Sequence, residues 1–529
     1  MSFNAGMLLR TKQSSTSARF VTLALLGVFL AFPLVGCDST GSSSGNGGDP
    51  PPSSGSDPVD GFTSQPAPIV VDGEGDDWTE LSVRYDDTGD GNIGIDRLWM
   101  AHTEEHLFLR LTLGQPIDLL EDNDLTLYLD TDNDPTTGEA ALGLGAELRW
   151  SFGERTGRLG DGQTISHEDI GLASLPTVRA NTFEIALDRS AAPGDQALFS
   201  GDRLRIGLSS GGDRLPDEDG GLGYEFSPTE IAADGPSIDR PVASDVRLFT
   251  YNVQQNSIFD PERQPHHRRI LNATDPDVVG LQEVASSADE TEQVAEGDLD
   301  IPDAWSWAKV GGDLVLGSRY PIQGTHTIPG SEGTPSGAFL LDTQEALGKE
   351  LLVVLMHPPC CNYEGGADEL SRNEQRQLVV DGVVAFLRDV KQGEGPFGVP
   401  SETPIVVTGD MNFVGDPQQP HTLRTGQIQN TDEFGEPAAP DWDGSPLLDT
   451  NPRQTAAPFH ITWITAESSF PPGRLDYTYV TDSVLDVVHE FVLSTRSLPD
   501  AELDAYGLQG EDTVIASDHL PLVVDLTLQ

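Results

Sequence analysis

Cysteine and aromatic residues are scarce in this chain, and both shortages narrow the class of fold. Its 529 residues include three cysteines, and aromatic residues make up 7% of them. Three cysteines cannot build the disulfide framework of many small secreted domains, so a hydrophobic core must supply the stability. With 56 glycines and 38 prolines, the composition favours many strands and turns over bundles of helices. The length allows about two to four domains.

Basic residues are the third shortage. Lys and Arg number 30 against 86 Asp and Glu, which gives a formal net charge of −56. A polyanion repels nucleic acid and anionic lipid unless a local basic patch or bound cations reverse the field. Two compatible interpretations are open. The charge is either a solubility adaptation to a salty medium that screens it, or a sign of Asp clusters that bind divalent cations.

Long hydrophobic runs are also rare, and the chain has one, at residues 20–35, behind the basic residues Arg10, Lys12 and Arg19. The run is shorter than the roughly 20 residues that a membrane-spanning helix needs, and it is typical of a secretory signal peptide. It ends in "LVGC", which resembles the lipobox of bacterial lipoproteins and implies that Cys37 becomes the lipidated N-terminus. An ordinary signal peptide with a chance cysteine is the alternative.

Residues 38–64 are rich in Gly, Ser and Pro, a composition typical of a flexible tether. An anchored protein needs such a spacer, so this stretch favours the lipoprotein interpretation. We therefore expect a signal peptide at residues 1–37 and a tether at 38–64. The protein is then held to the membrane by its N-terminal lipid alone, outside the cytoplasm of a bacterium, in the periplasm or at the cell surface.

Residues 65–235 are expected to form an all-β unit. Runs such as "HLFLRLTLG", "DLTLYLD" and "NTFEIALD" alternate apolar with polar residues and are separated by Gly, Asp and Asn turns, which predicts a β-sandwich. Asp72-Gly73, Trp78 and the strand pair around Trp99 and Leu107 resemble family-9-type carbohydrate-binding and DOMON-like domains. That resemblance implies a glycan as a partner of this unit.

Two turns of the same unit are rich in Asp, at residues 86–92 and 130–138. In the second turn Asp130, Asp132 and Asp134 stand at alternate positions, where their oxygens can surround a hard cation such as Ca²⁺. The turn lacks the distal Glu of an EF-hand loop, so it is not one. A solvated hairpin turn without an ion is the alternative.

From residue 244 onward, strand patterns alternate with helical ones, and polar residues recur where apolar strands end or begin. These residues are Asn252, Glu283, His357, Asp410, Asn412, Asp476, Asp518 and His519. Strand ends of packed α/β layers are rigid positions from which proteins present binding and catalytic groups. One such residue is usually a strand cap, whereas this many, rich in Asp, Glu, Asn and His, predict a single site.

The motifs "TYNV", "LQEV", "GDMN", "RLDY" and "SDHLP", in this order, resemble the endonuclease/exonuclease/phosphatase superfamily. The resemblance covers residues 244–529. It implies a catalytic domain with a four-layer α/β/β/α sandwich, in which the site lies along one edge of two packed mixed sheets. The expected architecture is therefore this α/β domain preceded by an all-β sandwich domain.

Cleavage of a phosphoester needs a divalent ion at the phosphate oxygens, a positioned water and help for the leaving oxygen. Carboxylates and an amide suit Mg²⁺ or Mn²⁺. The resemblance implies Glu283 as a direct metal ligand, with Asn252 and Asp518 completing or supporting the metal and phosphate site.

The same resemblance implies the catalytic roles. Asp410 orients or deprotonates the attacking water, and Asn412 holds the phosphate beside it. His519 contacts the phosphate, Asp476 orients His519, and His357 is a second catalytic histidine. The neighbouring Cys360 and Cys361 are either two thiols or a vicinal disulfide with a structural role, because a metal-activated water needs no thiolate.

The substrate is the least determined part of the prediction. Nucleases hold phosphates with rows of basic residues, and few are present here. We expect phosphodiester cleavage, with extracellular DNA or RNA as the first candidate and a phospholipid head group or a small phosphoester as the alternative. A catalytically inactive, glycan-binding surface protein is the alternative of another class, and the presence of Glu283, Asp410, Asp476 and His519 argues against it. The oligomeric state is left open.

Overall fold

The computed structural model describes residues 61–88, 94–228, 235–302, 304–331, 333–361 and 369–529. The predicted signal peptide with Cys37, most of the predicted tether and part of the turn at residues 86–92 lie outside these ranges. All described residues belong to one compact unit. None of the helices in the described ranges has the length and apolarity needed to cross a membrane.

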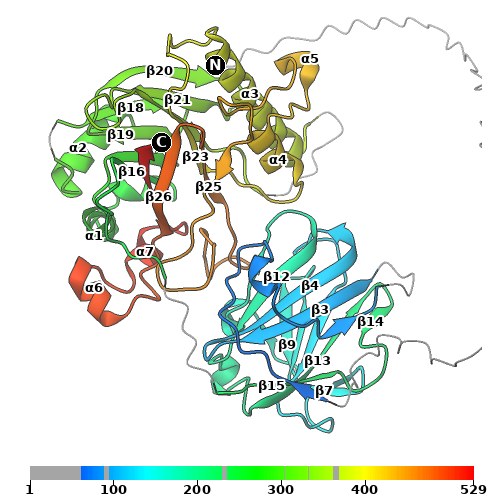
Figure 1. Cartoon of the computed structure of the whole chain (residues 1–529). Helices are drawn as coiled ribbons and strands as arrows, with labels where there is room; N and C mark the ends of the chain where they lie inside the picture. The colour runs from blue at the N-terminus through cyan, green and yellow to red at the C-terminus, as the bar shows by residue number, and fades with distance from the viewer. Residues whose placement is uncertain (1–60, 89–93, 229–234, 303, 332, 362–368) are drawn as a thin grey trace, which may run out of the picture. The chain divides into compact units, whose positions relative to one another are not determined.

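The N-terminal part of the described chain consists of two main β-sheets (Figure 1). Trp150, Phe152, Phe183 and the residues Leu107, Leu109 and Leu111 of one strand form the core between them. Alternation along that strand turns Phe108 to its other face, against Trp78. The predicted β-sandwich is confirmed.

The first sheet has eight strands, in the order β1 (Phe62–Thr63), β15 (Leu222–Glu225), β13 (Arg203–Ser210), β5 (Thr126–Asp130), β8 (Leu148–Ser151), β9 (Thr156–Leu159) and β10 (Thr164–Ile165), with β14 (Asp213–Leu215) beside β13. The second has five, in the order β11 (Ala173–Leu175), β12 (Ala180–Asp188), β4 (His106–Ile117), β3 (Ile95–His102) and β2 (Tyr85–Asp86). Strands β6 (Glu139–Ala141) and β7 (Leu144–Ala146) pair with each other.

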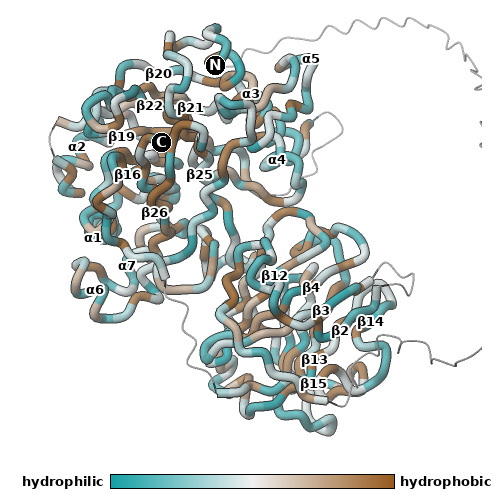
Figure 2. Tube along the Cα trace, in the orientation of Figure 1, coloured by the Kyte–Doolittle hydropathy of each residue, from teal (hydrophilic) through white to brown (hydrophobic). Residues whose placement is uncertain are grey.

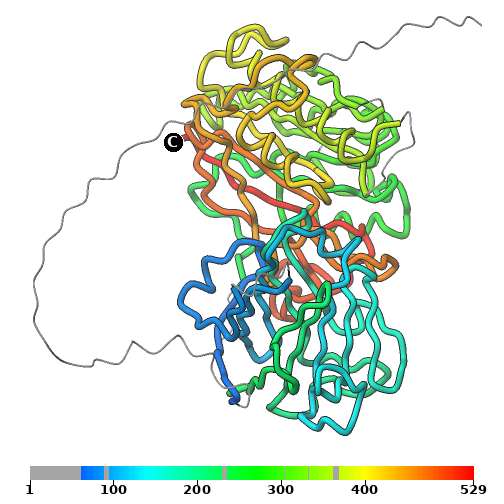
Figure 3. Tube along the Cα trace, turned by 90° about the vertical axis from the view of Figure 1, so that its right-hand side faces the viewer, coloured from blue at the N-terminus to red at the C-terminus, as the bar shows by residue number. Residues whose placement is uncertain are grey.

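The C-terminal part contains two six-stranded mixed sheets. One has the order β18 (Ser306–Val310), β19 (Leu314–Ser318), β17 (Val278–Gln282), β16 (Val246–Asn252), β27 (Leu522–Leu528) and β26 (Leu485–Val492). The other has the order β20 (Ile322–Ile328), β21 (Ser336–Leu341), β22 (Leu351–Met356), β23 (Ile405–Asp410), β25 (Asp476–Val480) and β24 (Leu448–Asp449). Because β27 pairs with β16, the red end of the chain returns among green segments (Figure 3).

The two sheets pack face to face through a core that includes Leu248, Leu316, Val353 and Leu355. These strands are apolar on both faces, so hydrophobic stretches run along them in the middle of this part (Figure 2). Parallel strands covered on both sides require such continuous apolar runs.

Helices cover the outer faces and complete four α/β/β/α layers, as the family resemblance implies (Figure 1). The sheet that contains β16 packs against α1 (Gln264–Thr274) and α2 (Ala288–Asp298). Two short helices, α6 (Asp500–Tyr506) and α7 (Asp512–Ala516), lie in the chain between its strands β26 and β27. The sheet that contains β23 packs against α3 (Arg372–Gln392), and α4 (Gln418–Thr425) and α5 (Thr431–Phe434) lie beside this helix. A capping box of Ser371 and Glu374 starts α3, where both reciprocal hydrogen bonds are present.

Strand direction brings the predicted site residues to one edge. β16 and β17 are parallel and end at Asn252 and Gln282, while β22 and β23 are parallel and end just before His357 and at Asp410. β25 is antiparallel to β23, so its first residue, Asp476, pairs with Asp410. β27 is antiparallel to β16, so the residues before its start also lie at this edge.

Candidate functional site

Asp410 stands at the centre of the polar residues that meet at this edge. Its side chain is 2% exposed, and its Oδ2 accepts a hydrogen bond of 2.9 Å from Asn252 Nδ2. The Nε2 atoms of His357 and His519 lie 3.5 and 3.6 Å from the same oxygen. Burial raises the pKa of Asp410, while the two histidines, His519 first, partly oppose this rise. One carboxylate is thus shared by an amide and two imidazoles.

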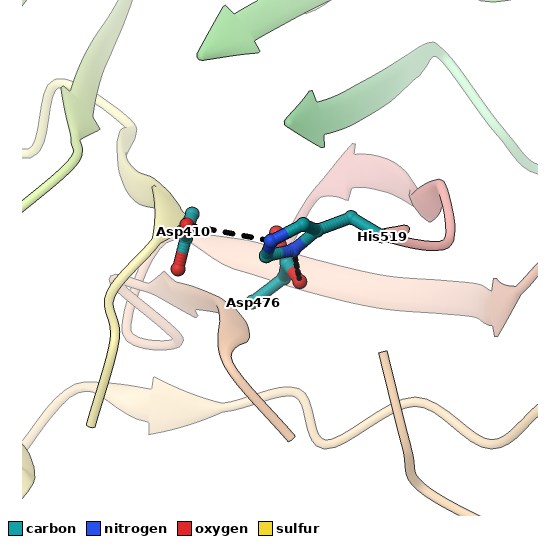
Figure 4. Close-up of side chains that lie close together, drawn as sticks. All are labelled: Asp410, Asp476 and His519. Carbon is teal, nitrogen blue, oxygen red and sulfur yellow. Dashed lines mark hydrogen bonds and ion pairs between the residues drawn. The ribbon is translucent and has the colours of Figure 1, made fainter. Parts of the chain in front are cut away.

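His519 is held by a second buried acid. Its Nδ1 donates to Asp476 Oδ2 over 2.8 Å, and the Asp476 side chain is 0% exposed (Figure 4). Burial alone lowers the pKa of His519, but the carboxylates of Asp476 and Asp410 raise it to about 10. The other oxygen of Asp476, Oδ1, is buried and has no hydrogen-bond partner among the described residues.

His357 has its own acid, which the sequence analysis missed. Its Nδ1 donates to Asp313 Oδ2 over 2.6 Å. Burial lowers the pKa of His357, but the hydrogen bond to Asp313 and the nearby Asp410 raise it to about 9. Asp313 directly precedes β19, which runs antiparallel to β17. The start of an antiparallel strand lies at the same sheet edge as the end of its neighbour, so the pairing of β19 with β17 places Asp313 at the site.

Glu283 and Asn252 contact each other beside this centre. Glu283 Oε1 accepts from Asn252 Nδ2 over 3.1 Å, and its Oε2 accepts from the backbone N–H of Gln255 over 2.6 Å. The backbone of Glu283 has φ of +63°, and that of Asn412 has φ of +50°. Side-chain-bearing residues adopt this left-handed conformation at a free-energy cost of roughly 1–3 kcal/mol, and such strain clusters at functional sites.

Asn412 and Asp518 border the same centre. The backbone N–H of Asn412 donates to Asp410 Oδ1 over 3.1 Å, and its side chain donates to the carbonyl of Pro358. Asp518 Oδ2 accepts from Trp463 Nε1 over 3.3 Å. Asp518 is also linked to Asn252 through Ser517, whose Oγ donates to the carbonyl of Asn252. All eight residues predicted for this site therefore gather at one edge of the two packed sheets.

Groups able to hold a metal occur in this site and in the β-sandwich. Asp410, Asp476 and His519 offer ligand atoms within 4.8 Å of one another. In the β-sandwich, Asp130 and Asp132 form such a group with Glu147.

The sequence analysis missed Glu147, because it lies in a different strand connection from the Asp-rich turn. Asp134, which the sequence analysis chose, instead accepts hydrogen bonds from the backbone and hydroxyl of Thr136. Calcium binding at this turn stays a prediction.

Cys360 and Cys361 form a disulfide in the segment that follows His357. Arg376 on α3 donates to the carbonyls of Pro359 and Cys361 and holds this segment in place. Of the two alternatives left open by the sequence, the structure has the vicinal disulfide, and these contacts give it a structural place.

Comparison with solved structures gives several partial likenesses. TDP2 of D. rerio, complexed with a single strand DNA product, is 13% identical with a TM-score of 0.34, covering 53% of this chain and 98% of that chain. ANGEL2, described as a 2′,3′-cyclic phosphatase, is 16% identical with a TM-score of 0.35, covering 53% and 95%. Sphingomyelinase C from Streptomyces griseocarneus is 16% identical with a TM-score of 0.31, covering 53% and 98%. A comparison with curated proteins finds no match.

The sequence profile of the Endonuclease/Exonuclease/phosphatase family matches residues 249–519, which is more than half of the 529 residues. The matched range begins three residues before Asn252 and ends at His519, so it contains every residue of the site described above. This chain belongs to the Endonuclease/Exonuclease/phosphatase family.

Proposed function

We propose that this chain is a divalent-metal-dependent phosphoesterase that hydrolyses phosphodiesters. One observation carries the proposal: a single buried carboxylate, Asp410, lies between two imidazoles, each supported by its own acid. A structural ion pair needs one such partner, whereas a row of acid, imidazole, acid, imidazole, acid is suited to binding an anion and moving a proton.

The oxygen-rich set around Asp410 fits a hard divalent cation. Glu283 and Asp518 supply carboxylate oxygens, which Mg²⁺ and Mn²⁺ prefer, while Asn252 turns its amide N–H to Glu283 and Asp410. The buried Oδ1 of Asp476 adds an oxygen without a partner in the described structure. A bound cation supplies charge neutralisation at the phosphate oxygens. In this proposal Glu283 is its direct ligand, with Asn252 and Asp518 in support.

The protein groups have complementary tasks. The raised pKa values of His519 and His357, about 10 and about 9, keep both imidazoles protonated at neutral pH, so their Nε2 atoms can donate to phosphate oxygens. Burial raises the proton affinity of Asp410, which suits a group that orients a water and accepts its proton. Asn412, whose backbone is bound to Asp410, contacts the phosphate beside it.

The location and accessory contacts belong to the same proposal. A signal peptide ending at Cys37, a tether and lipidation of Cys37 would hold the enzyme in the bacterial envelope, outside the cytoplasm, at residues that lie beyond the described ranges. The β-sandwich of residues 65–235 and the catalytic domain of residues 244–529 would be the two domains of the enzyme, and a glycan or Ca²⁺ would be the ligand of the β-sandwich. Extracellular nucleic acid is the first substrate class, and phospholipid head groups or small phosphoesters are the second.

The direct test uses the chain without residues 1–37. It should hydrolyse bis-p-nitrophenyl phosphate with Mg²⁺ or Mn²⁺, and EDTA should stop the reaction. Glu283→Gln should abolish most of the turnover while the melting temperature of the metal-free protein stays close to that of the wild type. Absence of hydrolysis with every divalent cation tried would overturn the proposal and leave the inactive, glycan-binding alternative.

A further inference from the structure

The loop of residues 451–475, here called the bracing loop, connects β24 to β25 and is held by the β-sandwich. The backbone N–H of Val71 donates to Pro458 over 2.8 Å, and the N–H of His460 donates back to Val71 over 3.0 Å. Ile461 of the loop is 1% exposed and belongs to the same hydrophobic core as Trp78. Paired backbone and a shared core make this contact part of the fold.

The bracing loop also contacts the site. Thr462 Oγ1 accepts from the backbone N–H of Asp476 over 2.9 Å, and Trp463 Nε1 donates to Asp518. The β-sandwich further reaches the segment after Asn412, where Arg179 donates its backbone N–H to Gly415 over 2.6 Å. The β-sandwich is therefore connected to the segments that carry three of the predicted site residues.

A pocket of about 570 Å³ lies between the bracing loop and the β-sandwich. His106, Leu172 and Asp188 of the β-sandwich line one side, and Phe459 and Ile464 of the bracing loop line the other. Volumes of this size hold small molecules, and such pockets favour junctions between structural units. A nucleic-acid duplex instead needs an open track along which many phosphates meet cations.

The pocket reaches Asp518, one of the residues predicted for the metal and phosphate site. Ser517 and Asp518 belong to its lining, and so does Gln254, whose backbone N–H donates to Asn252 Oδ1 over 3.0 Å. A phosphoester bound at Asp410 and His519 would thus have a space beside it for one of its esterified groups.

The walls of the pocket define the chemistry of that group. The ring of His106 meets the ring of Phe459 edge to face at 5.2 Å, and His106 Nδ1 is buried with no partner in the described part of the chain. The lining also contains apolar side chains such as Leu172 and Ile464, and its charged groups are two arginines and four acids, Arg263, Arg496, Glu168, Asp188, Glu467 and Asp518. Apolar and aromatic surface combined with a few polar groups suits a flat ring with a polar edge.

Resting on the proposed function, we infer that this pocket binds the esterified alcohol of a small phosphoester, of nucleoside size and with an aromatic ring. The β-sandwich then forms one wall of the substrate site. A pocket of this size and lining favours a small nucleotide-like ester over polymeric nucleic acid.

The test fills the pocket at an exposed position. Ala466 lines the pocket and is exposed, so Ala466→Trp can occupy the space without entering the core. Ala243→Trp is the matched control, because Ala243 is equally classed as exposed and lies outside the pocket lining. Circular dichroism and melting temperature check the fold of both variants.

The readout is the ratio of kcat/KM for the p-nitrophenyl ester of thymidine 5′-monophosphate to that for methyl p-nitrophenyl phosphate. The wild type should favour the nucleoside ester by about tenfold or more, and Ala466→Trp should remove most of this preference. Ala243→Trp should keep the wild-type ratio. His106→Ala, on the β-sandwich wall, should lower the ratio in the same direction, chiefly through KM for the nucleoside ester.

Outcomes separate the two proposals. If the wild type hydrolyses neither ester with any divalent cation, the proposed function is overturned. If it hydrolyses both without preference, or if Ala466→Trp leaves the ratio unchanged, the pocket inference is overturned and the proposed function stands. Cleavage of duplex plasmid DNA with a kcat/KM above that for the nucleoside ester would also overturn the pocket inference.

Discussion

The site has two halves, and each is a histidine supported by an aspartate. The two pairs differ in how far solvent reaches them. Asp476 is 0% exposed and supports His519, whereas Asp313 has a side chain that is 37% exposed and supports His357. Solvent weakens an ion pair at the surface, whereas a buried pair keeps its full geometry and charge. We therefore expect the buried pair to be the more exacting part of the site and the exposed pair to be the adjustable part.

Removal of each imidazole should give the largest difference between the halves. His519→Ala should lower kcat for bis-p-nitrophenyl phosphate by about 10²–10⁴-fold, the range typical of a lost acid or base. His357→Ala should lower it less, because water can reach the exposed side of that pair and replace part of the hydrogen bonding. Steady-state kinetics at saturating Mn²⁺ measures both, and a larger loss for His357→Ala would reverse the comparison.

Neutralising each acid is the next test. Asp476→Asn leaves the amide in a fully buried position, where an unsatisfied polar group destabilises a fold by about 1–3 kcal/mol. Asp313→Asn breaks a pair at the surface, which contributes roughly 0–1 kcal/mol. Urea unfolding of the metal-free proteins gives the two free energies. Equal losses of stability would show that exposure does not distinguish the two halves.

The pH dependence of the unfolding free energy tests the buried pair of His519 and Asp476. The folded pKa of His519, about 10, lies above the ordinary value of 6.5, so its pairing with Asp476 stabilises the protein fully below pH 6.5. This stability is lost as the pH rises through about 10. The difference in unfolding free energy between wild type and His519→Gln, measured in EDTA, should therefore shrink between pH 6 and pH 10. A difference that grows over this range would contradict the raised pKa.

The opposite pH dependence of stability is expected for a buried histidine outside the site. Burial lowers the pKa of His267 to about 3, and its Nε2 shares a hydrogen bond of 2.8 Å with Ser257 Oγ. A neutral buried histidine stabilises the fold above pH 6.5 and loses this contribution as the pH falls towards 3. The two histidines thus make the fold sensitive to alkali at His519 and to acid at His267.

Sequence reasoning identified the residues whose positions follow from strand direction alone. Asn252, Glu283, His357 and Asp410 follow strands that run the same way in pairs, so their meeting at one edge is predictable from apolar runs and their last residues. Asp313 was missed because it lies in none of the motifs that pointed to the site, and its place at the edge depends on the pairing of β19 with β17.

The contact of the bracing loop with the β-sandwich could not be predicted. It joins Val71 to Pro458, almost four hundred residues apart, through packing that leaves no periodic signal in either segment. Glu147 was missed for a similar reason, because it approaches Asp130 and Asp132 from beyond the Asp-rich turn. Local patterns therefore predicted the β-sandwich and the strand-end residues, the family resemblance predicted the four layers, and contacts set by pairing and packing required the structure.

Salt should give the smallest difference between the two halves, and it isolates exposure from every other property. Charges in water are screened over about 10 Å at 0.1 M salt and about 3 Å at 1 M, while buried charges are screened much less. The loss of kcat caused by Asp313→Asn should therefore shrink when NaCl is raised from 0.1 to 1 M. The loss caused by Asp476→Asn should stay the same.

Each variant is compared with the wild type at the same salt, so that effects of salt on substrate binding cancel. Equal salt dependence in both variants would mean that the exposed edge of Asp313 is closed to ions when substrate is bound, and the two halves would then act as one buried unit.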